Sequence, residues 1–280
     1  MVERKIIEGI SYGSALKSTD RLCHLLRQRN IGIVEAPISS VDEYRAIYDI
    51  CSKKDVKVSL HIPSPELVDK YPFLLRISSF EEIDRYIGCI VNFIKLIPLP
   101  EYVLVHFPMF TETSDIFADK RLDLYFAKKI YEWTRDKKIK LYYENIAIKN
   151  DLCLAKDYLP YMKYADGMVF DCGHAHSLAC FLERQGEARY VQDFFYEMSS
   201  FIKGIHLYNT VDKAIVKNNG EEYIAGAHYP FVNKYDGIEG FMNRKKIIKS
   251  ITKLPNLDWI IYEPELAFMT DEADYGDINI

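Results

Sequence analysis

The sequence has 280 residues, of which 49% are hydrophobic and 28% are charged. These proportions are typical of a globular protein and exclude a disordered chain, and the length fits one large α/β domain. The formal net charge of −5 gives the molecule no general basic surface, which argues against DNA or another polyanion as its partner.

Cysteine usage and apolar runs indicate the cellular compartment. The six cysteines are scattered, without the CxxC spacing of a metal or redox site. We therefore expect a reduced, cytoplasmic protein. No apolar run approaches the roughly 20 residues of a membrane span, and the first residues lead into a strand rather than an apolar signal region. No membrane partner is expected.

Short apolar runs alternate along the chain with segments of helical periodicity. The first helical segment begins at the capping sequence Ser18-Thr19-Asp20, and Leu22 and Leu25 lie on its apolar face. The predicted strands are residues 6–10, 31–34, 56–60, 102–105, 139–143, 168–170, 202–205 and 259–262. The predicted helices are residues 18–28, 41–53, 80–96, 121–137, 152–164, 189–199 and 238–252.

This alternation predicts a parallel barrel. The strands are continuous apolar runs, as expected where both faces of a sheet are covered. We predict a single TIM (β/α)8 barrel domain over residues 1–280, with long loops at about 61–80 and 207–237. The residues after the eighth strand are acidic, so the eighth helix should be short or absent. An open doubly wound sheet is the alternative, but the sequence lacks the GxGxxG phosphate-binding motif.

Most of the apolar runs end in a histidine or a carboxylate. Because all strands of a parallel barrel end at one face, such residues converge there although they are far apart in sequence. Imidazoles and carboxylates without thiolates suit zinc, manganese or iron. Cys172 is excluded, because strand alternation directs it elsewhere. The residues expected to converge are His61, His106, Glu144, Asp171, His174, His206 and Glu263, with Glu35, His176 and His228 close by.

Simpler interpretations apply to some of these residues. A single histidine after a strand is more often packed or hydrogen-bonded than a metal ligand, so the repetition of the pattern favours a metal site. His24 lies inside a predicted helix and is assigned to the core or the surface. His176 fits either a layer around the ligands or the surface. Glu35 could be a general acid, but a solvated acid at a strand end is the preferred interpretation.

Four segments resemble motifs of a known superfamily. They match an ENxA segment, a DxxHA segment, an HLND-like segment and a final glutamate, in that order along nearly the whole barrel. The chain thus resembles the xylose isomerase-like TIM barrels, which include endonuclease IV (AP endonuclease family 2) and many sugar or sugar-phosphate isomerases and epimerases. The four segments are Glu144-Asn145-Ile146-Ala147, Asp171-Cys172-Gly173-His174-Ala175, His206-Leu207-Tyr208-Asn209 and Tyr262-Glu263-Pro264.

The resemblance implies a divalent metal site whose size separates two branches of the superfamily. Isomerases and epimerases share a four-ligand site with one metal, whereas the nuclease-like branch adds histidines and binds three ions. We expect one to three ions per chain, with zinc as the first choice and manganese or iron as alternatives. The four-ligand set corresponds to Glu144, Asp171, His206 and Glu263. The additional histidines correspond to His61 and His106, which share Glu144 as a bridge, and to His174 and His228, which would hold the third ion.

Two departures from the nuclease pattern bear on the substrate. The nuclease carries an aspartate two residues before the histidine that matches His228, and this chain has Gly226 there. Asp212, Glu221 and Glu222 are the candidates to replace it. The segment over residues 35–40 is short and lacks the basic and aromatic residues with which the nuclease enters DNA, which argues against repair of abasic DNA.

The resemblance favours hydrolysis of a phosphoester or phosphodiester in a small substrate at a polynuclear metal site. The nucleotide loop of cobamides is one such substrate within the superfamily. The alternative is a sugar or sugar-phosphate isomerase or epimerase with a single metal, in which Glu144 and Glu263 act as paired acid and base groups. A non-catalytic metal-binding or ligand-binding barrel is a third hypothesis. Glu144 and Glu263 are the predicted catalytic residues, and Asn145, His176, Tyr208 and Tyr229 are the predicted substrate-binding residues.

Overall fold

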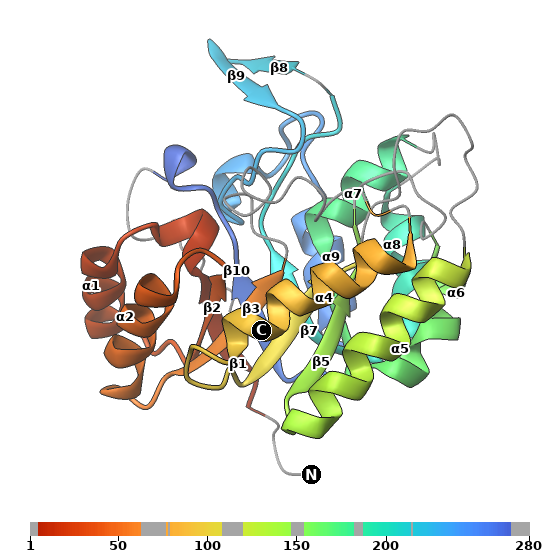
Figure 1. Cartoon of the computed structure of the whole chain (residues 1–280). Coiled ribbons are helices and arrows are strands. Elements are labelled where there is room, and N and C mark those ends of the chain that lie inside the picture. The colour runs from red at the N-terminus through yellow and green to blue at the C-terminus, as the bar shows by residue number, and fades with distance from the viewer. Residues whose placement is uncertain are drawn as a thin grey trace.

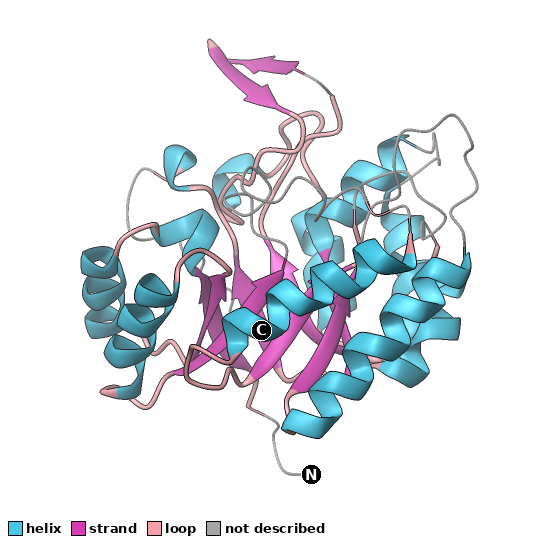
Figure 2. Cartoon of the chain, in the orientation of Figure 1, coloured by secondary structure: helices cyan, strands magenta, loops and turns pink. Residues whose placement is uncertain are grey.

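The computed structural model describes residues 5–62, 77, 79–107, 120–146, 154–181, 187–213 and 215–269. Within these residues, parallel strands close into a barrel, and helices cover its outer face (Figure 1, Figure 2). The predicted TIM barrel is therefore confirmed. None of the described helices has an apolar stretch long enough to cross a membrane.

The strands follow chain order around the barrel, and pairing of β1 with β10 closes it. Because neighbouring strands are parallel throughout, all of them direct their C-terminal ends to the same face. Each predicted strand overlaps an observed one. The barrel strands are β1 (Ile7–Ser11), β2 (Ile33–Pro37), β3 (Lys57–Ile62), β4 (Tyr102–His106), β5 (Lys140–Glu144), β6 (Gly167–Asp171), β7 (Ile202–Leu207) and β10 (Trp259–Tyr262).

Short polar side chains cap several of the helices. Ser40 Oγ accepts a hydrogen bond from the Glu43 N–H (3.1 Å), and Ser79 Oγ accepts one from the Glu82 N–H (3.2 Å). Each bond satisfies a backbone donor of the first turn, where the glutamates are also favourable to the helix dipole. The helices are α1 (Thr19–Gln28), α2 (Val41–Ser52), α4 (Phe80–Ile94), α5 (Lys120–Lys137), α6 (Ala155–Tyr158), α7 (Cys172–Phe181), α8 (Glu187–Met198) and α9 (Arg244–Ile251).

Helix α7 was not predicted from the sequence. It begins at Cys172, directly after β6, so no turn residues separate the strand from the helix. Most of the side chains described in α7 are buried, and the helix therefore lacks the polar face that makes a helix recognisable in a sequence. Its position matters for the site, because it carries His174.

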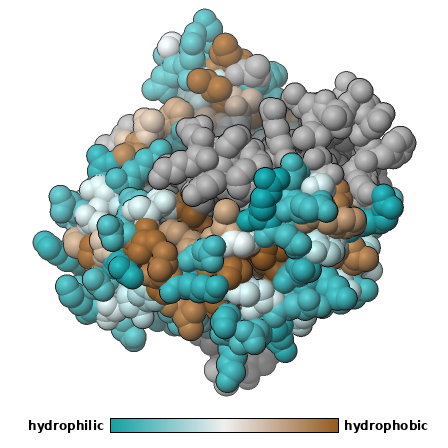
Figure 3. Space-filling model, in the orientation of Figure 1, coloured by the Kyte–Doolittle hydropathy of each residue, from teal (hydrophilic) through white to brown (hydrophobic). Residues whose placement is uncertain are grey.

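The segment predicted as a loop over residues 207–237 contains a hairpin of β8 (Ile215–Asn218) and β9 (Glu221–Ile224). Asn219 and Gly220 form its turn with positive φ angles of 51° and 87°, which fits the Asn-Gly preference of tight hairpins. The hairpin stands away from the barrel (Figure 1), and apolar atoms lie on it among polar ones (Figure 3). Ile215 and Ile224, which face each other across the strands, are 57% and 55% exposed.

Two of the predicted helices need correction. The helix predicted over residues 238–252 begins only at Arg244, because Gly240 adopts a φ of 91° and the Asn243 side chain accepts a hydrogen bond from the Lys246 N–H as the N-cap. The helix predicted over 152–164 is described as α6 followed by a 3-10 helix, Leu159–Tyr164. After β10 the described residues contain a single 3-10 turn, Leu266–Phe268, in agreement with a short or absent eighth helix. The loop predicted at 61–80 lies largely outside the described residues, as do residues 270–280.

The interior of the barrel is filled by large aromatic rings. Trp259 stacks on Tyr102, with ring centroids 4.9 Å apart, and meets the edge of Tyr142 at 5.0 Å. Gly204 on β7 makes room for the indole, since a Cβ atom there would lie 2.3 Å from Trp259 Nε1. The glycine is thus required by close packing against the neighbouring strand.

Gly204→Ala should destabilise the protein by about 1–3 kcal/mol, because the added methyl group must displace the indole of Trp259 in a packed interior. Equilibrium unfolding in urea measures the change. Gly88→Ala is the matched control: a Cβ atom on this α4 residue meets nothing within 4 Å, so helix propensity should leave stability unchanged or slightly higher. Equal midpoints for wild type and Gly204→Ala would contradict the packing argument.

Candidate metal centre

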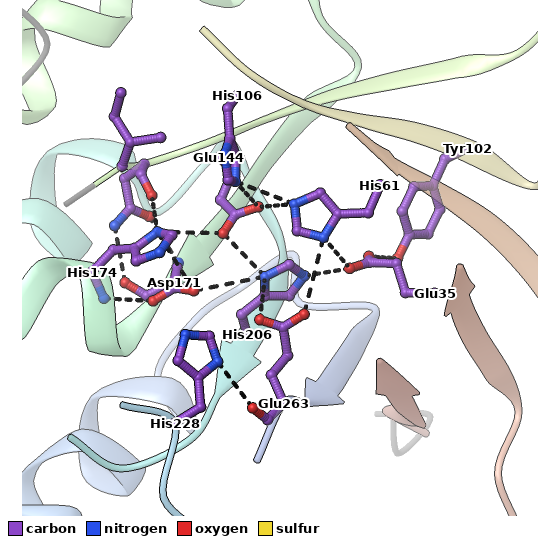
Figure 4. Close-up of polar contacts among 12 residues, drawn as sticks. Glu35, His61, Tyr102, His106, Glu144, Asp171, His174, His206, His228 and Glu263 are labelled. Atoms are coloured by element: carbon purple, nitrogen blue, oxygen red, sulfur yellow. Dashed lines mark hydrogen bonds and ion pairs between the residues drawn. The ribbon is translucent and has the colours of Figure 1, made fainter. Parts of the chain in front are cut away.

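Polar side chains from six neighbouring strands meet at the C-terminal face of the barrel (Figure 4). Most of them line a pocket of about 330 Å³, whose floor is formed by the strand ends. The convergence expected from the sequence is therefore found in the structure. The contributing residues are Glu35 from β2, His61 from β3, His106 from β4, Glu144 from β5, Asp171 from β6 and His206 from β7, with Glu263 directly after β10.

His61, His106 and Glu144 form the first group of potential ligands. Glu144 Oε2 lies 2.9 Å from His106 Nε2 and 3.1 Å from His61 Nε2. The two Nε2 atoms are themselves 3.2 Å apart. Two imidazole nitrogens and a carboxylate oxygen thus converge on one small volume, as they do around a divalent ion.

The second group surrounds the Nδ1 atom of His206. This atom lies 3.1 Å from Glu144 Oε1, 3.3 Å from Glu263 Oε2 and 3.8 Å from Asp171 Oδ2. Glu144, Asp171 and His206 offer ligand atoms that all lie within 4.8 Å of one another. Glu144 therefore belongs to both groups, with a different oxygen facing each.

Several buried oxygens of the cluster lack a well-aligned hydrogen bond from the described residues. They include Glu144 Oε2 and Asp171 Oδ2, whose carboxylates are at most 1% exposed. Buried acceptors of this kind are normally satisfied by a donor or by a cation. The nitrogen and oxygen donor set fits zinc and related divalent ions, so these clusters could hold a metal ion.

Asn145 fixes the position of Asp171 rather than pointing into the pocket. Its Nδ2 donates to the Asp171 carbonyl oxygen (2.9 Å), and its Oδ1 accepts from the Asp171 N–H (2.8 Å). The side chain, which is 3% exposed, thus ties the end of β5 to the end of β6. Asn145 was predicted to bind substrate, and the structure assigns these two amide contacts to the backbone instead.

His174 and His228 lie at the edge of the cluster, each with one ring nitrogen held by a backbone carbonyl. His174 Nδ1 is 2.9 Å from the Asn145 oxygen, and His228 Nδ1 is 3.0 Å from the Glu263 oxygen. A donating Nδ1–H leaves Nε2 as the nitrogen that can bind a metal or a ligand. Among the described residues, neither histidine joins a group of three donors within 4.8 Å.

Tyr208 packs between these elements and is 2% exposed. Its ring stacks on that of His228 with centroids 3.6 Å apart. Gly173 permits this arrangement, because a Cβ atom there would lie 2.2 Å from the Tyr208 ring. The glycine of the Asp171-Cys172-Gly173-His174 segment therefore serves packing. Tyr208, which was predicted to bind substrate, supports the ring of His228 by this stacking.

Two other predicted substrate-binding residues do not line this pocket. His176 is 2% exposed and lies on α7 with its Nε2 3.9 Å from Cys180 Sγ. Two residues along a helix correspond to about 200°, so His176 and His174 occupy opposite faces of α7. Tyr229 belongs to a separate aromatic cluster with Tyr223 and Tyr235, and its hydroxyl accepts from the Ile224 N–H (2.6 Å).

The acids proposed to replace the aspartate that is missing at Gly226 also lie outside the pocket. Glu222 pairs with Lys217 at 2.8 Å, Glu221 contacts the Tyr223 hydroxyl, and Asp212 is exposed. None of the three lines the pocket. Glu265 lies there instead, and its Oε1 accepts from the His228 N–H (3.4 Å). In the sequence, its position two residues after Glu263 could have indicated that it lies near the site.

Glu35 is the main correction to the sequence analysis. It was interpreted as a solvated strand-end acid, yet it is 1% exposed and lies against His206 and His61. The sequence signal was present, since Glu35 ends a strand like the other members of the cluster. The contact with His61 follows from the pairing of β2 with β3, and the contact with His206 follows from barrel closure, which leaves only β1 and β10 between β2 and β7.

Burial and mutual charge displace the pKa values within the cluster. Burial alone would raise the pKa of Glu144, but His206, His106 and His61 hold it well below its usual range. Burial would lower the pKa of His61, but Glu144 and Glu35 raise it to about 10. For Glu263, burial outweighs the imidazoles and raises the pKa to about 7. Protons and a metal ion would therefore compete for the same nitrogens.

The same barrel occurs in solved structures that share little sequence with this chain. L-ribulose 3-epimerase is 13% identical, with a TM-score of 0.60 over 96% of this chain and 84% of its own. AP endonuclease family 2 from Brucella melitensis is 10% identical, with a TM-score of 0.62 over 98% and 100%. Endonuclease IV from Thermus thermophilus is 12% identical, with a TM-score of 0.53 over 92% and 93%.

At this level of identity the likeness establishes the fold alone, which is that of a TIM barrel. No family model matches the sequence. No curated protein sequence is significantly similar to it. The reaction therefore has to be inferred from the site itself.

The metal-free protein should lose the stabilising contribution of His61 as the pH rises. The folded state raises the His61 pKa from 6.5 to about 10, so the contribution is complete below pH 6.5 and disappears towards pH 10. In chelator-treated protein, the unfolding free energy of wild type minus that of His61→Gln should fall with pH, by at most about 1.4 kcal/mol per unit. Urea unfolding at several pH values measures this difference. The exposed His24, replaced in His24→Gln, is the control, and a difference for His61→Gln that does not change with pH would refute the prediction.

Proposed function

We propose that this xylose isomerase-like barrel is a metal-dependent enzyme that hydrolyses a phosphoester or phosphodiester in a small substrate. The observation that carries the proposal is the convergence of His61 and His106 on Glu144, next to the group around His206, with a third group of Glu35, His61, His206 and Glu263 that overlaps both. Two adjacent donor sets joined by one carboxylate suit a pair of divalent ions. A pocket of about 330 Å³ also suits a small substrate.

The residues of the two groups have complementary tasks in this reaction. Bound divalent ions would supply a water of lowered pKa and would neutralise charge on the phosphate oxygens. Glu144 would contribute one oxygen to each donor set, because its two oxygens face different imidazoles. Glu263, whose carboxylate lies 3.3 Å from His206 Nδ1, would be the candidate to accept or release a proton.

The position of Lys17 in the pocket is evidence for an anionic substrate. Among the described residues that line the pocket, it is the one lysine or arginine, and four glutamates line the same pocket. Its φ of 50° is uncommon for a residue other than glycine, and it ends a single π-helical turn, Tyr12–Leu16. Such local irregularities are frequent at functional sites. A cation at an otherwise acidic opening would attract a phosphate group.

Zinc is the proposed metal, and manganese or iron are the alternatives, because the donors are imidazoles and carboxylates without a thiolate. Glu265 is the proposed replacement for the carboxylate missing at Gly226, since it lines the pocket and contacts the backbone of His228. In the described structure Glu265, His174 and His228 do not form a group of three donors within 4.8 Å, so a third ion would require these side chains to move closer together.

The alternative function is that of a sugar or sugar-phosphate isomerase or epimerase with one metal ion. The specific observation in its favour is the pairing of Glu144 with Glu263 around His206 Nδ1, at 3.1 and 3.3 Å. Two carboxylates with pKa values displaced in opposite directions could act as acid and base on one carbon atom. His61 and His106 have no necessary role in that reaction.

Metal stoichiometry separates the two functions. Protein purified without chelator should contain two or three ions per chain by elemental analysis, and the double variant His61→Ala, His106→Ala should contain about one fewer. Hydrolysis of bis(4-nitrophenyl) phosphate should be lost in the same variant, because the first donor set is removed. His24→Ala controls for the loss of a histidine outside the cluster. A single ion that survives the double substitution, together with epimerisation of ketose sugars, would favour the alternative.

Lys17→Met should raise the KM for bis(4-nitrophenyl) phosphate about tenfold, equivalent to about 1.4 kcal/mol of binding free energy, with little change in kcat or metal content. The substitution removes the charge and keeps most of the side-chain volume. Lys57→Met is the control, since Lys57 begins β3 at the opposite end of the barrel. An unchanged KM for Lys17→Met would contradict a role in attracting the substrate.

A further inference from the structure

Glu35 contacts three side chains that come from three different strands. Its Oε2 lies 2.8 Å from His206 Nε2 and 3.2 Å from His61 Nδ1. Its Oε1 accepts a hydrogen bond from the Tyr102 hydroxyl (2.7 Å). One carboxylate oxygen thus touches an imidazole from each of the two donor groups (Figure 4).

Each of these imidazoles presents its other nitrogen to the potential metal ligands. His61 directs Nε2 to Glu144 Oε2, and His206 directs Nδ1 to Glu144 Oε1, both at 3.1 Å. When a histidine donates one ring N–H to a carboxylate, the tautomer is fixed and the opposite nitrogen keeps its lone pair for a metal. Glu35 Oε2 lies 2.8 and 3.2 Å from one nitrogen of each ring and is within reach of both, although the described side chains do not align these contacts as hydrogen bonds.

We propose that Glu35 is a positioning residue that orients His61 and His206 together and thereby couples the two halves of the metal centre. The proposal rests on the proposed metal-dependent function, because it assigns Glu35 a task towards the ligands of that site. Glu35 offers an oxygen within 4.8 Å of ligand atoms of His61, His206 and Glu263, but this assignment gives it the task of orienting the imidazoles and not of binding the metal. It acts through the two imidazoles that it contacts.

Tyr102 holds the carboxylate in the orientation that this task requires. Its hydroxyl binds Oε1, so that Oε2 faces the imidazoles. The Tyr102 ring is fixed by stacking on Trp259 at 4.9 Å and by an edge contact with Tyr142 at 5.2 Å. The hydrogen bond from Tyr102 to Glu35 therefore connects the aromatic side chains inside the barrel to the site.

The buried charge itself also indicates a positioning role. Glu35 is 1% exposed, and a carboxylate at such a position loses its hydration. A well-packed apolar residue of the same volume would commonly be as stable or more stable. The presence of a carboxylate at this position is therefore better explained by orientation of its partners than by packing.

The test compares Glu35→Ala and Glu35→Gln by zinc affinity, measured in competition with a chromophoric chelator, and by the visible absorption of the cobalt(II)-substituted protein. Glu35→Ala should weaken zinc binding about 10- to 100-fold and alter the cobalt bands, because both imidazoles lose their support. Glu35→Gln should recover most of the affinity, since an amide oxygen can still accept from both rings. Tyr102→Phe, which removes one hydroxyl, should shift the cobalt bands in the same direction with a smaller loss of affinity.

The outcomes separate this proposal from the proposed function. Wild-type protein that binds no zinc or cobalt would overturn both. Metal binding by wild type with unchanged affinity and spectrum in Glu35→Ala would overturn the role of Glu35 alone. Equal losses in Glu35→Ala and Glu35→Gln would assign the effect to charge and overturn the positioning role. If Glu35→Ala does not fold, the other two variants decide. Wild-type spectra in both Glu35→Gln and Tyr102→Phe would overturn the proposal. Shifted bands in Tyr102→Phe, together with near-wild-type affinity in Glu35→Gln, would support it.

Discussion

The buried charge of Glu144 is the constraint on which the site depends. Its carboxylate is 1% exposed, and its two oxygens face imidazoles of different groups, His61 and His106 on one side and His206 on the other. A carboxylate at this depth is costly unless cations or donors surround it. The histidines meet that requirement, and the same arrangement creates the donor sets that suit metal ions.

Strand register brings these residues together. His106 and Glu144 are direct partners across β4 and β5, and Asp171 and His206 are partners across β6 and β7. A shift of one residue in either pair would turn one partner away from the pocket. The register is in turn maintained by close packing inside the barrel, where Gly204 accommodates Trp259. The chemistry at the strand ends and the packing below them are therefore parts of one arrangement.

The sequence predicted the barrel and most of the cluster because both follow from local patterns. Buried parallel strands are continuous apolar runs, and a polar residue at the end of each run is visible without a structure. The roles of Glu35 and Asn145 could not be predicted in this way. Glu35 is buried through contacts with Tyr102 and His206, which are distant in sequence, and the Asn145 amide is directed by the backbone of Asp171. Helix α7 was missed because a helix buried on most sides has no polar face.

The fold alone does not distinguish an epimerase from a phosphoester hydrolase. The group of His61, His106 and Glu144 bears on this question. The Nε2 atoms of His61 and His106 are 3.2 Å apart and face the same oxygen of Glu144. In a site with one metal around His206, these two nitrogens would have to share protons at close range, and the positive charge on one would oppose charge on the other. In the proposed function, a second divalent ion held by His61, His106 and Glu144 would use both lone pairs and the carboxylate. The geometry of this pair is therefore compatible with the proposed polynuclear centre, and in the metal-free protein one ring can donate a hydrogen bond to the other.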